Sequence, residues 1–212
     1  MSRKMFKLLG IAAVALAVVG TGLTFSLSSQ TTAEAAAVAI PPIGTICVKP
    51  ANMTHIFNPR GTQGGPVANT NGSITAQVGQ PISTTDGRSG FNFAVTNFIS
   101  NGFVQGLGNT SIKLDTSRKP APSTFISNSP SSSGALTAAD SNTQRINFFI
   151  TVSIDGRQYR SQGQVTLLGT AVDSFPPPPG TVYELASPVT LVDSAGNVAF
   201  VLPAGHAAKI SG

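Results

Sequence analysis

Residues 145–169 carry the clearest alternation of apolar and polar side chains in the chain. The run RINFFITVSIDGRQYRSQGQVTLLG has two β-rich halves on either side of Asp155-Gly156. An Asp-Gly pair between alternating runs predicts a β-hairpin, because a type I′ turn needs positive φ at both central residues. With this turn, one face of the hairpin is mostly apolar and the other mostly polar. A slip of one residue would exchange the two faces, so the pattern specifies the register.

The turn fixes which residues of the two strands face each other. The expected pairs on the apolar face are Ile154 with Arg157, Val152 with Tyr159, Ile150 with Ser161, Phe148 with Gly163, and Ile146 with Val165. Phe148 is expected to cover the backbone of Gly163. Phe149 is the aromatic residue of the polar face. We expect a loop to cover it, with a role in ligand contact as the alternative.

Shorter β patterns and turn signals occupy most of the remaining chain. Strands are predicted within 44–48, 73–78, 91–96, 110–115, 189–193 and 198–202. Loops or turns are predicted at 58–72, 86–87, 101–102 and 106–109, where Gly, Asn, Asp and Pro gather. Residues 117–143 form a long Ser/Pro-rich segment that is typical of a surface loop. Pro176 to Pro179 is expected to run as polyproline II across one end of the same domain.

These patterns predict an all-β fold. No stretch after residue 37 has a helical period, and no internal repeat is present. Many short strands with polar turns favour a single antiparallel β-sandwich over residues 38–212, of immunoglobulin-like or jelly-roll type, with a β-barrel as second choice. The run VTLVDSAGNVAF, residues 189–200, resembles the last hairpin of bacterial immunoglobulin-like repeats. That resemblance is confined to these residues and includes no site.

The first 37 residues have the features of a secretory signal peptide, expected as a helix. Arg3, Lys4 and Lys7 form a positive start, and 8–27 is a continuous apolar or small-residue run. Small residues at 33–37 offer cleavage sites, so we expect a mature chain that begins between Ala36 and Val38. The alternative is a retained membrane anchor, because the apolar run reaches the lower limit for a membrane span. The predicted location is therefore secreted, cell-surface or periplasmic, with membrane contact only if the segment is uncleaved.

Charge changes this picture little. Beyond residue 37 the chain has ten Lys or Arg against seven Asp or Glu, a net charge of +3. The positive residues are scattered, and the closest groups are Arg118 with Lys119 and Arg157 with Arg160. Nucleic-acid binding requires a basic stripe or patch, so no nucleic-acid partner is expected and these residues are interpreted as solvated surface.

Candidate catalytic groups are few. Cys47 is the only cysteine and lies in an apolar run, so it is predicted to be a buried and unreactive side chain, with pairing to another chain as the alternative. His55 and His206 have no spacing typical of a zinc site. A Cys47–His55 nucleophile pair is conceivable but has no orienting third group.

The acids fall mostly in turns or at strand ends, where Asp is favoured for local structure. They are Asp86, Asp115, Asp140, Asp155, Asp173, Glu184 and Asp193. No catalytic, metal or cofactor-binding residue is therefore predicted, and no cofactor is expected.

The sequence favours an exported, non-enzymatic protein with a structural or interaction role at the cell surface or outside the cell. The alternative is a small glycan- or polymer-binding module that acts through its loops. An enzyme with a dispersed active site is the third possibility. A groove lined by Phe or Tyr with Asn and Arg would favour glycan binding, whereas a deep pocket joining a histidine to an acid would favour catalysis.

Overall fold

The computed structural model describes residues 37–38, 40–60, 62–130, 136–137, 142–172, 174–205 and 207–211. Contacts divide the chain into Met1–Glu34 and Ala35–Gly212, and every described residue belongs to the second unit. Apart from Ala37, the predicted signal peptide and its helix lie outside the described residues. Across the described ranges, we find no helix with the length and apolar character needed to cross a membrane.

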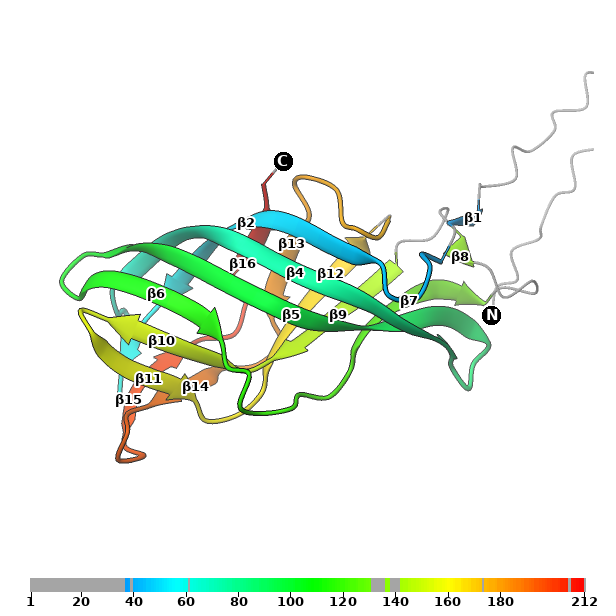
Figure 1. The fold of residues 1–212 in the computed structure, drawn as a ribbon. Helices are drawn as coiled ribbons and strands as arrows, with labels where there is room; N and C mark the ends of the chain where they lie inside the picture. Colours follow the sequence, from blue (N-terminus) through cyan, green and yellow to red (C-terminus); the bar gives the residue numbers. More distant parts are fainter. Residues whose placement is uncertain are drawn as a thin grey trace, which may run out of the picture. The chain divides into compact units, whose positions relative to one another are not determined.

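The described chain is built from β-strands and the turns that join them (Figure 1). The strands are β1 (Ala37–Val38), β2 (Ile46–Ile56), β3 (Asn58–Pro59), β4 (Val67–Ser83), β5 (Arg88–Val104), β6 (Gly108–Leu114), β7 (Ser123–Pro130), β8 (Leu136–Thr137), β9 (Asn142–Phe148), β10 (Ile150–Ile154), β11 (Arg157–Ser161), β12 (Val165–Val172), β13 (Val182–Leu185), β14 (Val189–Val192), β15 (Val198–Leu202) and β16 (Ala207–Ile210). β1 and β8 pair in a small separate sheet.

Eight of these strands close into an antiparallel β-barrel. The order around the ring is β5, β4, β2, β16, β13, β12, β9 and β7, and β7 pairs back with β5. The all-β prediction is confirmed, and the barrel, which was the second choice, is the observed architecture. The β-sandwich prediction is wrong, because closure of the sheet on itself leaves one continuous wall instead of two facing sheets.

The strand that closes the barrel lies inside the predicted long loop. Residues 117–143 were expected to be loop, but Ser123–Pro130 form β7, which pairs with both β5 and β9. The side chains of Ser123, Phe125 and Ser127 are buried, and Thr124 and Ile126 between them are half-buried. Two serines at inward positions conceal the alternation that a run of larger apolar residues would display.

A second group of strands extends the wall beyond the closed ring. β6 pairs with the later part of β5, and the sheet continues through β10, β11, β14, β15 and β3. β10 follows β9 after one residue, Phe149, and β3 follows β2 after Phe57. Of the long strands, β5 is therefore shared by both parts, and β6, β10, β11, β14 and β15 lie toward one end (Figure 1).

Two predicted loops are partly strand. Residues 67–72 of the expected 58–72 loop belong to β4, and Asn101-Gly102, expected as a turn, lies within β5 opposite Thr70 and Asn71. Small residues occupy the inner face of β4 here. Gly72 is one of them, and because it has no side chain the backbones of β4 and β5 approach closely. Gly and Asn therefore mark close strand packing at these positions, not a turn.

The central hairpin forms as predicted near its turn. Asp155 and Gly156 have φ of 45° and 80°, as a type I′ turn requires, and the predicted pairs Ile154–Arg157 and Val152–Tyr159 are confirmed. Farther from the turn the register differs by two residues, because Val165 pairs with Phe148 and not with Ile146. A shift of two keeps the same face inward, so the core residues are correct although their partners are not.

The two-residue difference arises where the second strand of the hairpin leaves the first. The backbone N–H of Gln162 donates to the carbonyl of Thr190, 2.8 Å away. Gly163 is consequently open, with nothing within 4 Å of the position that a Cβ would take. The prediction that Phe148 covers Gly163 is therefore wrong. Phe149 is covered as expected: the guanidinium of Arg118, which follows β6, lies 4.0 Å from its ring centroid.

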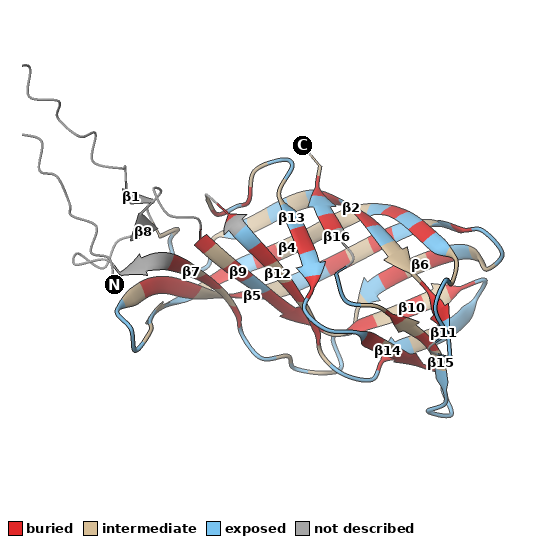
Figure 2. Cartoon of the chain, turned by 180° about the vertical axis from the view of Figure 1, so that it is seen from behind, coloured by how far each residue is buried: buried red, intermediate tan, exposed pale blue. Residues whose placement is uncertain are grey.

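One apolar core fills the barrel, and buried and exposed residues alternate along the strands around it (Figure 2). At one place the core is completed by a loop residue. Phe175, between β12 and β13, lies 5.0 Å from Phe91, 5.3 Å from Phe93 and 6.0 Å from Phe125, measured between ring centroids. The tetraproline therefore follows a residue that is anchored in the core, and it connects two strands of the same barrel.

Gly156→Val is expected to lower the free energy of unfolding by about 1–2 kcal/mol, because a β-branched residue would be held at positive φ. Nothing lies within 4 Å of the position of its Cβ, so the cost is one of backbone conformation alone. Gly163→Val is the matched control, since that glycine is equally open but has no positive φ. Thermal unfolding followed by circular dichroism measures both, and an unchanged melting curve for Gly156→Val would contradict the turn assignment.

Candidate functional site

The histidine and cysteine considered for catalysis are held apart by the strand that carries both. Cys47 and His55 belong to β2 and are separated by eight residues, which corresponds to about 26 Å along an extended strand. His55 lines an internal cavity of about 20 Å³, with room for a single water molecule, and its ring lies edge-on to Phe57. The other residues around this cavity are apolar. The conceivable Cys47–His55 pair is therefore excluded.

The acids that the structure describes do not converge. Asp86 pairs with Arg88 at 2.8 Å and Asp115 with Arg118 at 2.9 Å, while Asp155 accepts a hydrogen bond from the backbone of Asn109. Within the described ranges no three His, Cys, Asp or Glu side chains gather as metal ligands would. His206, Asp140 and Asp173 lie outside the described residues.

Cys47 is half-buried on β2 and packs against the core, and burial raises the pKa of its thiol. A raised pKa lowers the fraction of reactive thiolate at neutral pH. We therefore expect a thiol reagent to label the native protein slowly and the urea-unfolded protein quickly. Labelling that is equally fast in both states, or a covalent dimer on a non-reducing gel, would contradict this expectation.

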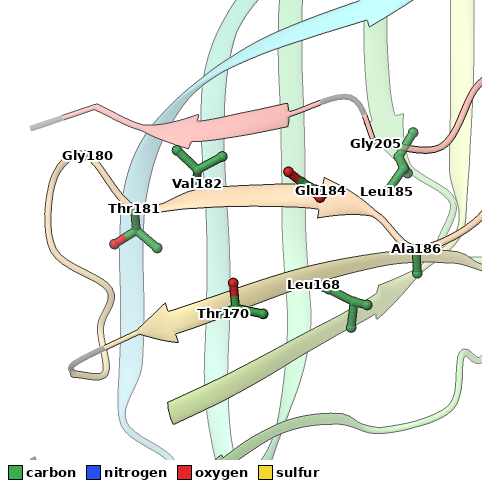
Figure 3. Close-up of a pocket in the computed structure, with 9 residues that line it drawn as sticks. All are labelled: Leu168, Thr170, Gly180, Thr181, Val182, Glu184, Leu185, Ala186 and Gly205. Carbon is green, nitrogen blue, oxygen red and sulfur yellow. The ribbon is translucent and has the colours of Figure 1, made fainter. Parts of the chain in front are cut away.

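A hollow of about 540 Å³ lies between β12 and β13 (Figure 3). It forms because these strands pair over only two positions, Leu167 with Leu185 and Leu168 with Glu184. Glu184 is the one ionisable residue among those that line it, and the others are Leu168, Thr170, Gly180, Thr181, Val182, Leu185, Ala186 and Gly205. This hollow therefore offers a single charged group and no aromatic ring.

A larger groove, of about 780 Å³, lies where β11 separates from β14 and β15. β11 pairs with β14 only at Arg160–Val192 and Ser161–Leu191, and a bulge follows Leu191. Beyond these pairs the two segments diverge and leave space between them. We call this space the arginine groove; it is lined by Arg60, Arg157, Gln158, Tyr159, Asp193, Ser194, Asn197, Val198, Ala199 and Phe200.

Aromatic rings form the base of the arginine groove. Tyr159 is half-buried and meets Phe200 edge to face, with ring centroids 5.2 Å apart. Phe200 in turn packs against the fully buried Phe57 at 5.7 Å. Each ring is therefore fixed by the next, and Tyr159 is held in place by the core while part of it faces the groove.

Arginine side chains dominate the charge of the groove. Arg60 and Arg157 are both exposed. Arg160 lines an adjoining hollow of about 280 Å³ that shares Gln158, Tyr159, Asp193 and Ser194 with the groove. The ion pairs found among the described residues are those of Arg88 and Arg118, so no described carboxylate neutralises any of these three arginines.

The carboxylate of Asp193 is engaged within its own turn. Its Oδ1 accepts hydrogen bonds from the backbone N–H groups of Asn197 and Ala195, each at 2.9 Å, and its Oδ2 accepts one from the Asn197 side chain. These bonds, above all that from the Asn197 backbone, lower the pKa of Asp193. Asp193 therefore stabilises the turn that forms one side of the groove and remains ionised at neutral pH.

Arg60 has an unusual backbone. Its φ is 47°, a conformation that residues other than glycine adopt uncommonly, and its N–H donates to the carbonyl of Ala199 at 2.9 Å. β3, just before it, pairs with β15 at Pro59–Phe200 and Asn58–Val201. The strand pairing thus holds this arginine at the groove in spite of a conformational cost of about 1 kcal/mol.

The sequence alone did not indicate that these residues lie together. Arg157 and Arg160 were interpreted as solvated surface and Arg60 was predicted in a loop, and no signal in the sequence indicated that β3 would pair with β15. The one available signal was Tyr159, a large aromatic residue predicted on the same face as Ile154 and Val152. A tyrosine at the edge of an apolar face is typical of a residue with one side in the core and the other in water.

The fold and the groove define the protein as a closed antiparallel β-barrel with a polar, arginine-lined surface groove. No family model and no curated protein matches the sequence. The structure of DynF, from the dynemicin biosynthesis pathway of Micromonospora chersina, is similar, with a TM-score of 0.62 over 89% of this chain and 93% of that chain. The two sequences are 14% identical, so the similarity concerns the fold.

Proposed function

We propose that this protein is an exported, non-enzymatic β-barrel that acts by binding a glycan or another polymer outside the cell or at its surface. The observation that carries the proposal is the arginine groove, which combines a core-anchored Tyr159 and Phe200 with Asn197, Arg60 and Arg157. Its volume of about 780 Å³ lies within the usual range of ligand sites. The groove is open, and it offers a ligand aromatic rings as well as hydrogen-bonding groups.

The polar groups of the groove favour binding over catalysis. A general acid or base needs a pKa near the working pH. The groove's carboxylate, Asp193, has its pKa lowered by hydrogen bonds within its own turn, which moves it away from that range. The remaining polar groups are guanidinium, amide and hydroxyl groups, which bind and position a ligand through hydrogen bonds.

Export is proposed from the sequence. The positive residues at 3–7, the apolar run at 8–27 and the small residues at 33–37 together have the order that export machinery recognises. The expected product is a mature chain that begins between Ala36 and Val38. The intact mass of the exported protein tests this, and a mass that still includes residues 1–35 would favour a membrane-anchored protein.

A panel of immobilised glycans tests the binding role directly. The wild-type protein is expected to retain at least one glycan, and Ser194→Trp is expected to weaken that binding at least about tenfold by filling the groove. Ala195→Trp is the matched control, because Ala195 is exposed on the same turn but does not line the groove. Binding that is equal in both variants would refute the groove as the contact surface.

A further inference from the structure

The unneutralised arginines of the groove indicate which glycans it selects. Resting on the binding function proposed above, we propose that the arginine groove recognises acidic glycans, whose sugar units carry carboxylate groups. Arg60 and Arg157 would bind the carboxylate, while Tyr159 would contact the face of the sugar ring. This assignment concerns the ligand class and names the residues that distinguish an acidic from a neutral chain.

The charges around the groove are unequal. Arg60 and Arg157 line it and Arg160 lines the adjoining hollow, whereas Asp193 is the one carboxylate shared by the two spaces. Both oxygens of Asp193 already accept hydrogen bonds within the turn. A carboxylate is therefore the ligand group that would compensate the arginines, and a guanidinium binds it through two parallel hydrogen bonds.

Two features fix the backbone positions of the arginines relative to the ring. Arg157 and Tyr159 are alternate residues of β11, so they project from the same face of one strand. Arg60 is held from the opposite side by the pairing of β3 with β15 and by the hydrogen bond from its N–H to Ala199. The two cations therefore approach the groove from separate segments, Arg157 from β11 and Arg60 from the end of β3, and the Tyr159–Phe200 contact joins β11 to β15.

A sugar acid satisfies both parts of this arrangement. Its ring has an apolar C–H face that can pack on the half-buried Tyr159, and its carboxylate extends from the ring edge toward the cations. Gln158, Ser194 and Asn197, all exposed, supply amide and hydroxyl groups for the sugar hydroxyls. A simple anion would use the arginines alone, and a neutral sugar would leave them without a partner.

Isothermal titration calorimetry with a galacturonic acid hexamer and its fully methyl-esterified form tests the proposal. The two ligands share the sugar backbone and differ at the carboxyl groups, which are anions in one and neutral methyl esters in the other. The wild-type protein is expected to bind the acid at least about tenfold more tightly than the ester, and this preference is expected to shrink as salt rises from about 0.05 to 0.5 M. Equal affinity for both forms would overturn the proposal.

Two variants test whether the groove arginines produce the preference for the acid over the ester. Arg60→Gln and Arg157→Gln are each expected to weaken binding of the acid about tenfold, and to weaken it more than they weaken binding of the ester, so that the preference for the acid falls. Arg145→Gln, which removes the same charge from an exposed position on β9, is the control and is expected to bind like the wild type. An unchanged preference for the acid in both groove variants would also overturn the proposal.

Two further outcomes separate this inference from the function on which it rests. If a single-stranded DNA dodecamer binds as tightly as the acid with the same salt dependence, the groove captures anions generally and the selection of sugar acids is refuted. If neutral glycans bind equally and Ser194→Trp abolishes that binding, the proposed function stands and the inference fails. If no glycan binds at all, the proposed function fails as well.

Discussion

Phe175→Ala is expected to lower the free energy of unfolding by about 4 kcal/mol, which corresponds to a fall of about 10 °C in melting temperature. Phe175 is 8% exposed and its ring packs against those of Phe91, Phe93 and Phe125. Truncation to alanine would remove the hub of this aromatic cluster and leave a cavity that the closed barrel cannot easily collapse. Equilibrium unfolding in urea measures the change.

Phe103→Ala is the matched control for this prediction. Phe103 lies on β5 and is 63% exposed, and its replacement by alanine is the same chemical change as in Phe175→Ala. Its truncation is expected to alter the free energy of unfolding by less than about 0.5 kcal/mol. Equal stability of the two variants would show that the segment between β12 and β13 does not insert its phenylalanine into the core.

Gly72→Ala is expected to destabilise the protein by about 3 kcal/mol, because β4 and β5 approach too closely at this point for a side chain. A Cβ at Gly72 would overlap the carbonyl oxygen of Ile99 and lie 2.6 Å from the Cα of Ser100. Both obstacles are backbone atoms of the neighbouring strand, so they cannot move aside without breaking the ladder.

Gly163→Ala is the control, because an added Cβ there would have nothing within 4 Å. Where an alanine fits without strain, it changes stability by no more than about 1 kcal/mol, usually in the favourable direction. If β4 and β5 pack closely at Gly72, thermal melts should show a lower melting temperature for Gly72→Ala and an unchanged or slightly higher one for Gly163→Ala. A Gly72→Ala protein as stable as Gly163→Ala would contradict the observed contact between β4 and β5.

Local features of the fold could be predicted from the sequence, but the closure of the sheet into a barrel could not. The Asp155-Gly156 turn and the pairs beside it follow from turn chemistry and alternation, which act over a few residues. The barrel depends on β7, whose inward positions include Ser123 and Ser127, and on its pairing with β5 between residues that lie 30 (Phe93–Ser123) to 42 (Arg88–Pro130) positions apart in the sequence. Small polar residues and long-range pairing leave little trace in a local pattern.

The register of the central hairpin shows the same limit. Alternation correctly placed Ile146, Phe148 and Val165 in the core, but the pairs far from the turn shifted by two residues. The cause is tertiary, since Gln162 bonds to Thr190 and Arg118 donates to the carbonyl of Ser161 at 2.7 Å. A two-residue shift preserves the faces, so the hydrophobic pattern alone does not oppose it.

The candidate site was less predictable than the fold. Its residues come from three segments that meet only because β3 pairs with β15 and β11 separates from β14. Arg157 and Arg160 were visible in the sequence as a pair of charges, and the approach of Arg60 was not. A surface groove made by divergence of strands is defined by tertiary pairing, and no local sequence motif specifies it.

The arginine groove is the surface through which we propose that the protein binds its ligand. The most direct measurement is a ¹H–¹⁵N correlation spectrum of the protein titrated with the tightest-binding glycan of the panel. The amide signals of Gln158, Ser194 and Asn197 are predicted to shift most. Shifts that centre instead on Thr170, Thr181 and Glu184, in the hollow between β12 and β13, would contradict the claim (Figure 3).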